Sequence, residues 1–170
     1  MTEQKKAAHP ERIKDRRDTE GLNPFSRLPA IYSASRSQAQ RFLKLAGGLS
    51  IVEWRTLWDL AEAGPMTIRD LAAIQRSDHS LISRALPAMR RKGYVTMVQD
   101  SQDKRQTLVH LTAEGRAAYD RAAPIMARRR AALRDAMSED DIRRLIDLLN
   151  RLEEFLNVPA DDILELETST

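Results

Sequence analysis

Apolar residues recur along the chain with two different periods. From residue 22 to residue 92, and again from residue 112 to residue 157, they return every three or four positions, as in amphipathic helices. Between these regions, Tyr94–Val98 and Thr107–Leu111 are short runs suited to strands, and they flank a polar, charged segment. The pattern predicts a mostly α-helical fold with one small β-hairpin.

Capping residues mark the first two helices. Asparagine at position 23, followed by proline, suits the start of a helix that reaches Ala46. In that case Pro29 would kink the helix; the alternative is a regular helix that begins at Ser26. Ser50 and Glu53 have the spacing of a capping box, in which each side chain satisfies a free backbone N–H of the other residue. A second helix is therefore predicted to begin directly after Ser50.

Two shorter helices follow, with a tight polar turn between them. Thr67 caps the first, which runs to Ile74, and the second spans about Asp78–Lys92. This arrangement is the outline of a helix-turn-helix, and the hairpin that follows Gly93 adds a wing. The predicted fold is a winged helix-turn-helix joined to an α-helical dimerisation region.

The helix over Asp78–Lys92 has an apolar back and a polar front. The residues expected to pack inward are Leu81, Ile82, Ala85, Leu86 and Met89. The residues expected to face DNA are His79, Ser80, Ser83 and Arg84. Arg84 is the strongest candidate for a base contact, because a guanidinium pairs bidentately with guanine. A solvated polar face is the alternative, and Pro87 is expected to bend the helix after Arg84.

The hairpin tip carries Asp103, Lys104 and Arg105. An arginine that projects from a wing can enter a narrow minor groove, where the negative potential is strongest. Asp103 could hold that guanidinium extended. Net charge supports the same reading: the segment from Thr67 to Arg105 has eight cations and four anions, whereas the whole chain has a net charge of +3.

Two long helices are predicted to end the domain, one from Thr112 to about Met137 with a bend at Pro124, the other from Ser138 to Asn157. The second has an apolar seam with alternating steps of three and four: Ile142, Leu145, Leu149, Leu152 and Leu156. This spacing is typical of a coiled coil and indicates a partner helix.

The remaining composition limits the function. Residues 1–21 are dense in charge and are expected to be a mobile tail, and residues 158–170 a loosely attached acidic one. The sequence has no cysteine, which excludes disulfides and thiolate metal sites. No apolar run is long enough to span a bilayer, so a cytoplasmic protein that does not bind membranes is expected.

Five sequence pieces together resemble the MarR family of transcriptional regulators. They are Leu49-Ser50-x2-Glu53-Trp54-Arg55-x-Leu57, Thr67-Ile68-x2-Leu71-Ala72, Ile82-Ser83-Arg84, Gly93-Tyr94-Val95 and Asp103-x-Arg105-x5-Leu111-Thr112-x2-Gly115. The resemblance covers residues 22–157 and implies a dimer in which residues 22–48 and 112–157 form the interface, Phe25 and Leu28 included, while residues 49–111 form the DNA-binding lobe. It also assigns Arg84 and Arg105 to DNA and implies a pocket for a small, often aromatic and anionic, effector.

The sequence gives little support for a catalytic site or a metal site. Asp78, His79 and Ser80 are not a catalytic triad, because consecutive helical residues point about 100° apart. The three histidines lack ligand spacing, so no metal or other cofactor is expected. Tyr32, Trp54 and Trp58 are candidate pocket residues, although their periodicity favours core positions first; a core residue at the edge of a pocket would serve both roles.

The sequence therefore predicts a non-enzymatic homodimer that binds a pseudo-palindromic double-stranded operator, acting as a ligand-responsive repressor. The alternative is a winged-helix protein-interaction module without specific DNA binding. Arg84 and Arg105 favour the regulator, because an interaction module would have no need of these forward-facing cations.

Overall fold

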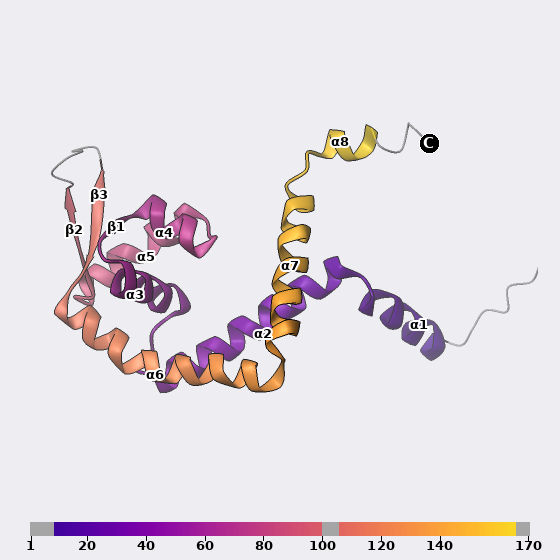
Figure 1. The fold of residues 1–170 in the computed structure, drawn as a ribbon, viewed down its shortest axis with the longest axis horizontal. Helices are drawn as coiled ribbons and strands as arrows, with labels where there is room; N and C mark the ends of the chain where they lie inside the picture. The colour runs from indigo at the N-terminus through magenta and orange to yellow at the C-terminus, as the bar shows by residue number, and fades with distance from the viewer. Residues whose placement is uncertain (1–8, 100–105, 166–170) are drawn as a thin grey trace, which may run out of the picture. The chain divides into compact units, whose positions relative to one another are not determined.

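The computed structural model describes residues 9–99 and 106–165, which are mostly helical, as predicted (Figure 1). In chain order the elements are α1 (His9–Gly21), α2 (Pro24–Leu45), α3 (Ile51–Ala63), β1 (Met66–Thr67), α4 (Ile68–Gln75), α5 (His79–Arg91), β2 (Val95–Gln99), β3 (Thr107–Leu111), α6 (Ala113–Ala136), α7 (Glu139–Leu156) and α8 (Ala160–Glu165). The chain divides into two compact units, Met1–Met126 and Ala127–Thr170, with the boundary inside α6.

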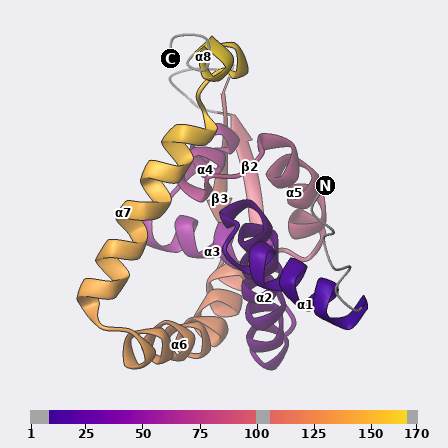
Figure 2. The same cartoon turned by 90° about the vertical axis from the view of Figure 1, so that its right-hand side faces the viewer.

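The sheet has three antiparallel strands in the order β1-β3-β2. Val95 pairs with Leu111 and Gln99 with Thr107, which confirms the predicted hairpin. The sequence analysis missed β1, whose Met66 pairs with Val109 on the other side of β3, because two residues are too few to show any periodicity. α4 and α5 pack against this sheet, so the wing and the helix-turn-helix share one base (Figure 2).

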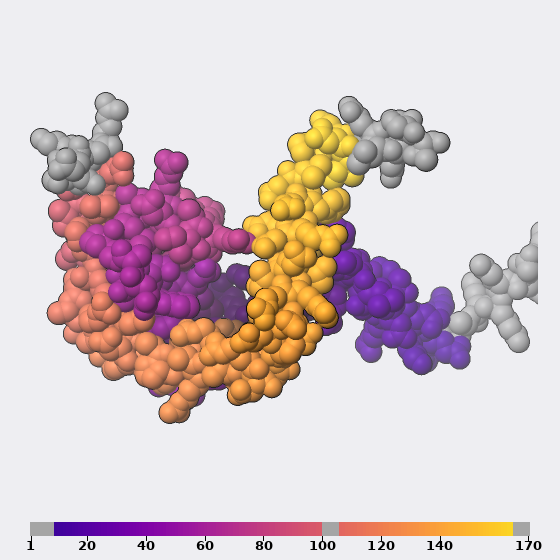
Figure 3. All heavy atoms as spheres, in the orientation of Figure 1, coloured from indigo at the N-terminus to yellow at the C-terminus, as the bar shows by residue number. Residues whose placement is uncertain are grey.

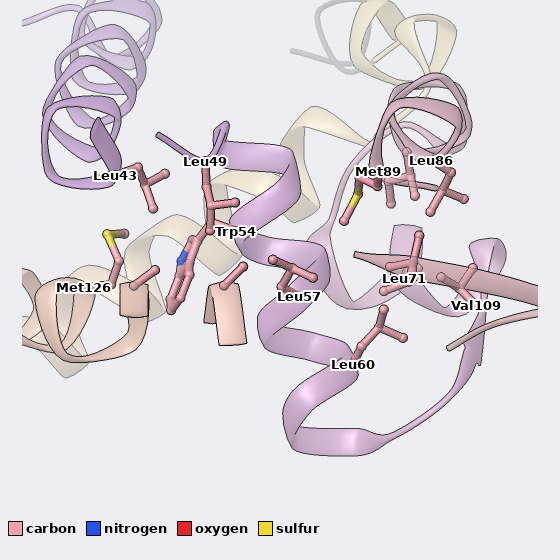
Figure 4. Close-up of a cluster of buried hydrophobic side chains, with 14 of the residues drawn as sticks. Leu43, Leu49, Trp54, Leu57, Leu60, Leu71, Leu86, Met89, Val109 and Met126 are labelled. Atoms are coloured by element: carbon pink, nitrogen blue, oxygen red, sulfur yellow. The ribbon is translucent and has the colours of Figure 1, made fainter. Parts of the chain in front are cut away.

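The core of the first unit is built around α3. Trp54 packs toward Leu43 and Met126 on one side of this helix, whereas Leu57 faces Leu71 and its neighbours on the other (Figure 4). All buried hydrophobic side chains in the described ranges lie between residues 39 and 126. Helix α3 thus joins the end of α2 and the start of α6 to the helix-turn-helix.

Local capping explains where the helices begin. Ser50 and Glu53 make both hydrogen bonds of the predicted capping box, and Asn23, Thr67 and Ser138 cap α2, α4 and α7. The prolines at positions 29 and 124 lie inside continuous helices.

The two terminal segments contain helices that the sequence analysis did not predict. Residues 9–21 form α1, and the acidic segment after residue 158 contains α8. Both helices follow from local interactions: Arg16 forms an i,i+4 ion pair with Glu20, and Asp161 and Asp162 lie in the first turn of α8, where negative charge is favourable. Since α1 has no buried residue, this order owes little to a core.

Candidate nucleic-acid interface

The helix-turn-helix is held by a cap at each helix start. The Thr67 hydroxyl accepts from the amide of Asp70 at 3.1 Å, and the Asp70 carboxylate accepts from the Thr67 amide at 3.1 Å. Arg76, the C-cap of α4, has a positive φ of 46°. Asp78 then caps α5, because its carboxylate accepts from the Ser80 amide at 2.8 Å. The turn between the helices is therefore only three residues long, as the sequence predicted.

The back of α5 is anchored in the core. Ile82, Leu86 and Met89 are almost completely buried. The prediction that Leu81 points inward is wrong, because this residue is 39% exposed. It lies about 100° around the helix from Ile82 and so falls at the edge of the packed face.

The front of α5 is open to solvent. His79, Ser80, Ser83 and Arg84 are all exposed, and the α4–α5 segment lies at the surface in the space-filling view (Figure 3). The Arg84 side chain folds back along its own helix: Nε donates to the Ser80 carbonyl at 3.1 Å, and Nη2 donates to Ser80 Oγ at 3.3 Å. The recognition face therefore presents a guanidinium with a defined orientation.

Asp78 completes this local network. Its second carboxylate oxygen accepts from the Ser80 hydroxyl at 2.8 Å. Hydrogen bonds from the backbone amide and then the hydroxyl of Ser80 lower the pKa of Asp78 below its ordinary value, so this carboxylate is ionised near neutral pH.

Pro87 does not end the recognition helix, since α5 continues to Arg91. Proline has no backbone N–H, so the Ser83 carbonyl lacks its usual intrahelical donor. Because Pro87 is exposed, this missing bond lies toward solvent rather than in the core. The expected bend therefore leaves the helix uninterrupted.

The wing follows the recognition helix in the chain, and its strand β2 packs against α5. Asp103, Lys104 and Arg105 lie outside the described residues. A hollow of about 550 Å³ marks the base of this side. Its lining comes from the starts of α4, α5 and β3: Thr67, Ile68, Arg69, Asp70, His79, Gln106 and Thr107. The starts of these three elements thus lie close together around one mostly polar hollow.

An ion pair fixes the far end of the recognition helix. Lys92, the C-cap of α5, donates to Glu53 Oε1 at 2.7 Å, while the other oxygen of Glu53 accepts from the Ser50 amide. Burial alone would raise the pKa of Glu53, but the hydrogen bonds and charge of Lys92 and the Ser50 amide outweigh it and leave that pKa lowered. Glu53 therefore couples the start of α3 to the end of α5.

A polar cluster supports the turn from behind. Gln75 is only 3% exposed, and its side chain donates to Asp59 at 2.8 Å. Its carbonyl accepts from Arg55 at 2.6 Å. Burial, partly offset by Gln75 and the charge of Arg55, raises the pKa of Asp59. Next to the cluster, the Ser77 hydroxyl is buried without a hydrogen-bond partner among the described residues.

The wing joins α6 through a tight junction. The Thr112 hydroxyl donates to the Gly93 carbonyl and accepts from the Gly115 amide. A Cβ added to Gly115 would lie 2.1 Å from the Tyr94 carbonyl oxygen. Only glycine therefore fits where α6 crosses the start of β2.

The tentative pocket residues fall into two groups. Trp54 and Trp58 lie together, with ring centroids 5.6 Å apart, and Tyr119 stacks on Trp54 at 5.7 Å. Trp54 is buried in the core, whereas Tyr32 is 66% exposed on α2. The structure thus brings the two indoles together and leaves Tyr32 apart from the core.

The positions predicted to form the dimer interface remain largely uncovered in the single chain. On α2, Phe25 is exposed and Leu28 is half-buried. Helix α7 has no buried residue. Its predicted seam comprises half-buried and exposed positions: Ile142 and Leu152 in the first group, Leu145, Leu149 and Leu156 in the second.

The described residues contain no group of three or more His, Asp or Glu side chains that could hold a metal ion. No helix among them is long and apolar enough to cross a membrane.

Sequence reasoning missed three supporting residues of this interface. Lys92 is separated from Glu53 by 39 positions, so no local pattern could pair them. The sequence pattern places Gln75 in the polar turn after Ile74, whereas it is the buried last residue of α4. Asp78 was taken as the first residue of the helix, although its type, before a polar helix start, favours an N-cap.

Sequence comparisons point to DNA-binding regulators. A winged helix DNA-binding domain family matches residues 49–115. An uncharacterized HTH-type transcriptional regulator from Bacillus subtilis is 28% identical over 104 residues, covering 61% of this chain and 68% of that protein. A second such regulator, from Bacillus cereus, is 27% identical over 138 residues, covering 81% and 91% of the two chains.

Solved structures of regulators share the fold. The M. tuberculosis transcriptional regulator MosR, in complex with DNA, has a TM-score of 0.66 and 25% identity, covering 79% of this chain and 98% of its own. NadR in complex with 4-hydroxyphenylacetate has a TM-score of 0.61 and 26% identity, covering 74% and 88%. A mutant of E. coli MarR complexed with operator DNA has the same fold, with a TM-score of 0.66 at 21% identity over 78% and 96% of the chains.

Proposed function

Because the chain is a winged helix-turn-helix transcriptional regulator of the MarR type, we propose that it binds a pseudo-palindromic double-stranded operator as a homodimer. Two recognition helices would enter successive major grooves about one helical turn apart. In this proposal the regulator is a repressor that a small effector releases from DNA.

The observation that carries the proposal is the division of α5 into two faces. Its back is locked by Ile82, Leu86 and Met89, so the helix has a fixed position on the lobe. Its front presents His79, Ser80, Ser83 and Arg84 to solvent. We assign Arg84 to a guanine and the short side chains to bases or phosphates, which they can approach closely.

The wing adds a second contact in this proposal. Asp103, Lys104 and Arg105 would follow the minor groove that flanks each half-site, with Arg105 inserted and Lys104 near a phosphate. The antiparallel register supports it, because β2 and β3 stay paired up to Gln99 and Thr107, which flank these three residues in the sequence.

The homodimer would form through the two terminal parts of the domain. We assign the α7 seam to it, together with Phe25 and Leu28, because a helix with an exposed apolar stripe is stabilised when another copy covers it. The dimer would set the half-site spacing.

The effector in this proposal is a small aromatic or anionic molecule. NadR, a regulator of the same fold, has been solved with 4-hydroxyphenylacetate, which is both. Trp58 and Tyr32 are our candidates for direct contact, whereas buried Trp54 would act through the Trp58 ring against which it packs.

Gel mobility shifts test the proposal, using DNA from upstream of the protein's own gene and a scrambled duplex at two salt concentrations. Wild type should prefer the native duplex and bind it less tightly at high salt. Arg84→Ala should lose about 1–3 kcal/mol of binding free energy for the native duplex and should relax the base preference at one base pair. Arg105→Ala should weaken binding to all sequences and flatten the salt dependence.

Arg128→Ala is the matched control, because it removes one exposed arginine from α6, outside the helix-turn-helix. It should bind like wild type. If wild type shows no preference in an unbiased selection from random duplexes, the chain is better described as a protein-interaction module.

A further inference from the structure

The recognition face carries a chain of four hydrogen bonds among Asp78, Ser80 and Arg84. We infer that Asp78 and Ser80 are positioning residues that aim the outer edge of the Arg84 guanidinium at a guanine. This inference rests on the proposed function and adds to it two residues that control specificity through a third.

Guanidinium geometry decides which donors remain for DNA. Arginine has five N–H donors in a planar fork, with Nε and Nη2 along one edge and Nη1 and Nη2 at the end. Ser80 occupies the first edge with two acceptors, its carbonyl at 3.1 Å from Nε and its hydroxyl oxygen at 3.3 Å from Nη2. The end of the fork keeps two parallel donors, which match O6 and N7 of guanine.

Asp78 sets the direction of the serine hydroxyl. A hydroxyl has one hydrogen and two lone pairs, and here its hydrogen goes to Asp78 Oδ2 at 2.8 Å. The lone pairs of Ser80 Oγ are therefore available to Arg84. Because the lowered pKa of Asp78 keeps its carboxylate ionised, it remains an acceptor near neutral pH.

Holding the guanidinium in advance favours guanine over other bases. A free arginine rotates among many conformers and can reach phosphates as easily as bases. When Ser80 holds the Nε/Nη2 edge, the plane of the guanidinium is fixed and its Nη1/Nη2 end points in one direction. Removing the network should therefore lower discrimination at one base pair more than it lowers total affinity.

Asp78→Asn is the sharpest variant, because asparagine caps helices as well as aspartate does. Its amide group donates to Ser80 Oγ where the carboxylate accepted, so residue 78 takes one of the two lone pairs of that oxygen. The Ser80 hydrogen must then turn away from residue 78 and competes with Arg84 for the space beside the remaining lone pair. We expect guanine preference at the Arg84 position to fall about tenfold. Affinity for scrambled DNA should stay equal or rise, because the change also removes a negative charge near phosphates.

Two further variants separate positioning from capping. Ser80→Ala removes the hydroxyl and should also lower the guanine preference at that base pair, by about three- to tenfold. Ser80→Thr keeps a hydroxyl and should retain the guanine preference of wild type. Asp120→Asn, which removes one exposed negative charge on α6, should leave the base preference unchanged. Each variant is first checked by circular dichroism for an unchanged melting temperature.

The readout is a set of operator duplexes, with all four bases at the position that Arg84→Ala identifies. Parallel loss of guanine preference in Asp78→Asn and Ser80→Ala supports the inference. If Arg84→Ala loses the guanine preference at that base pair while Asp78→Asn and Ser80→Ala both keep it, the inference is overturned and the proposed function stands. If wild type binds no duplex specifically, the proposed function itself fails.

Discussion

The two compact units of the chain reach their structure in different ways. In the first, Met1–Met126, α3 is surrounded by buried side chains from α2, α4, α5, α6 and the sheet. In the second, Ala127–Thr170, α7 has a strong apolar stripe but no buried residue. One unit closes its own core, whereas the other presents apolar surface.

This difference indicates where the information in each unit is used. Changes in the core of the first unit should act on folding of the monomer, because the apolar side chains of this core are already covered by the same chain. Changes along α7 should act on association, because its leucines gain burial only from another molecule. Four variants, each with a control, test this division.

Gly115→Ala should have the largest effect. The new methyl group would lie 2.1 Å from the Tyr94 carbonyl oxygen and 2.8 Å from Leu111 Cδ1, and backbone cannot move aside as a flexible side chain can. We expect a loss of about 3 kcal/mol or more in the free energy of unfolding, measured by thermal denaturation followed by circular dichroism. Gly21→Ala, where a Cβ meets nothing within 4 Å, should change it by less than about 1 kcal/mol. A normal melting curve for Gly115→Ala would show that the junction is looser than described.

Leu149→Asn combined with Leu152→Asn should act on the second unit. Each leucine would lose about 1.5–3 kcal/mol of burial if the seam is covered in a dimer. Sedimentation equilibrium should show a shift from dimer to monomer, with weaker operator binding, while the first unit keeps its fold. Asp147→Asn, on the opposite side of α7, should remain dimeric. An intact dimer in the double variant would contradict the assignment of the seam.

Glu53→Gln should lower stability by about 1 kcal/mol at pH 7, because it removes a half-buried ion pair with Lys92. The pKa of Glu53 is lowered below its ordinary 4.5, so the carboxylate stabilises the fold above pH 4.5 and loses this effect as the pH falls through its lowered pKa. Urea denaturation should therefore show the gap between variant and wild type closing below pH 4.5.

The control for Glu53→Gln comes from the second unit. Glu139 pairs with Arg143 at 3.2 Å, but both side chains are at least 70% exposed. Glu139→Gln should change stability little at any pH. If Glu53→Gln and Glu139→Gln lowered stability equally, the half-buried ion pair of the first unit would contribute no more than the exposed pair of the second.

Ser77→Ala should have the smallest effect and the opposite sign. Its hydroxyl is buried without a partner among the described residues, so removing it should be neutral or stabilising by up to about 1 kcal/mol. Ser50→Ala, which removes a helix cap from the same unit, should cost about 1 kcal/mol. Chemical denaturation of both variants measures the contrast; a clear loss in Ser77→Ala would indicate a bound water that satisfies the hydroxyl.

What could be predicted from sequence was local. The capping box at Ser50 and Glu53, the helix-turn-helix and the hairpin all depend on neighbouring residues, and the structure contains each of them. The exposed front of α5 followed from helical periodicity, which erred only at Leu81, on the edge of the packed face.

The features that could not be predicted from sequence depend on contacts between distant parts of the chain or on several weak local interactions acting together. The pairing of Glu53 with Lys92 depends on how α3 crosses α5, and strand β1 exists only because β3 lies beside it. Segment α1 has the charge of a tail, but its charges are spaced so that Arg16 and Glu20 pair along a helix. Composition alone does not reveal that spacing.

The aromatic cluster of α3 has a practical consequence for spectroscopy. The chain has only two tryptophans, Trp54 and Trp58, and both lie in the first unit with Tyr119 stacked on the former. Residues 127–170 contain neither tryptophan nor tyrosine. Intrinsic fluorescence therefore reports on the DNA-binding lobe, whereas far-ultraviolet ellipticity reports on the helices of both units. A comparison of the two signals during unfolding distinguishes loss of the lobe from loss of α7 without any attached label.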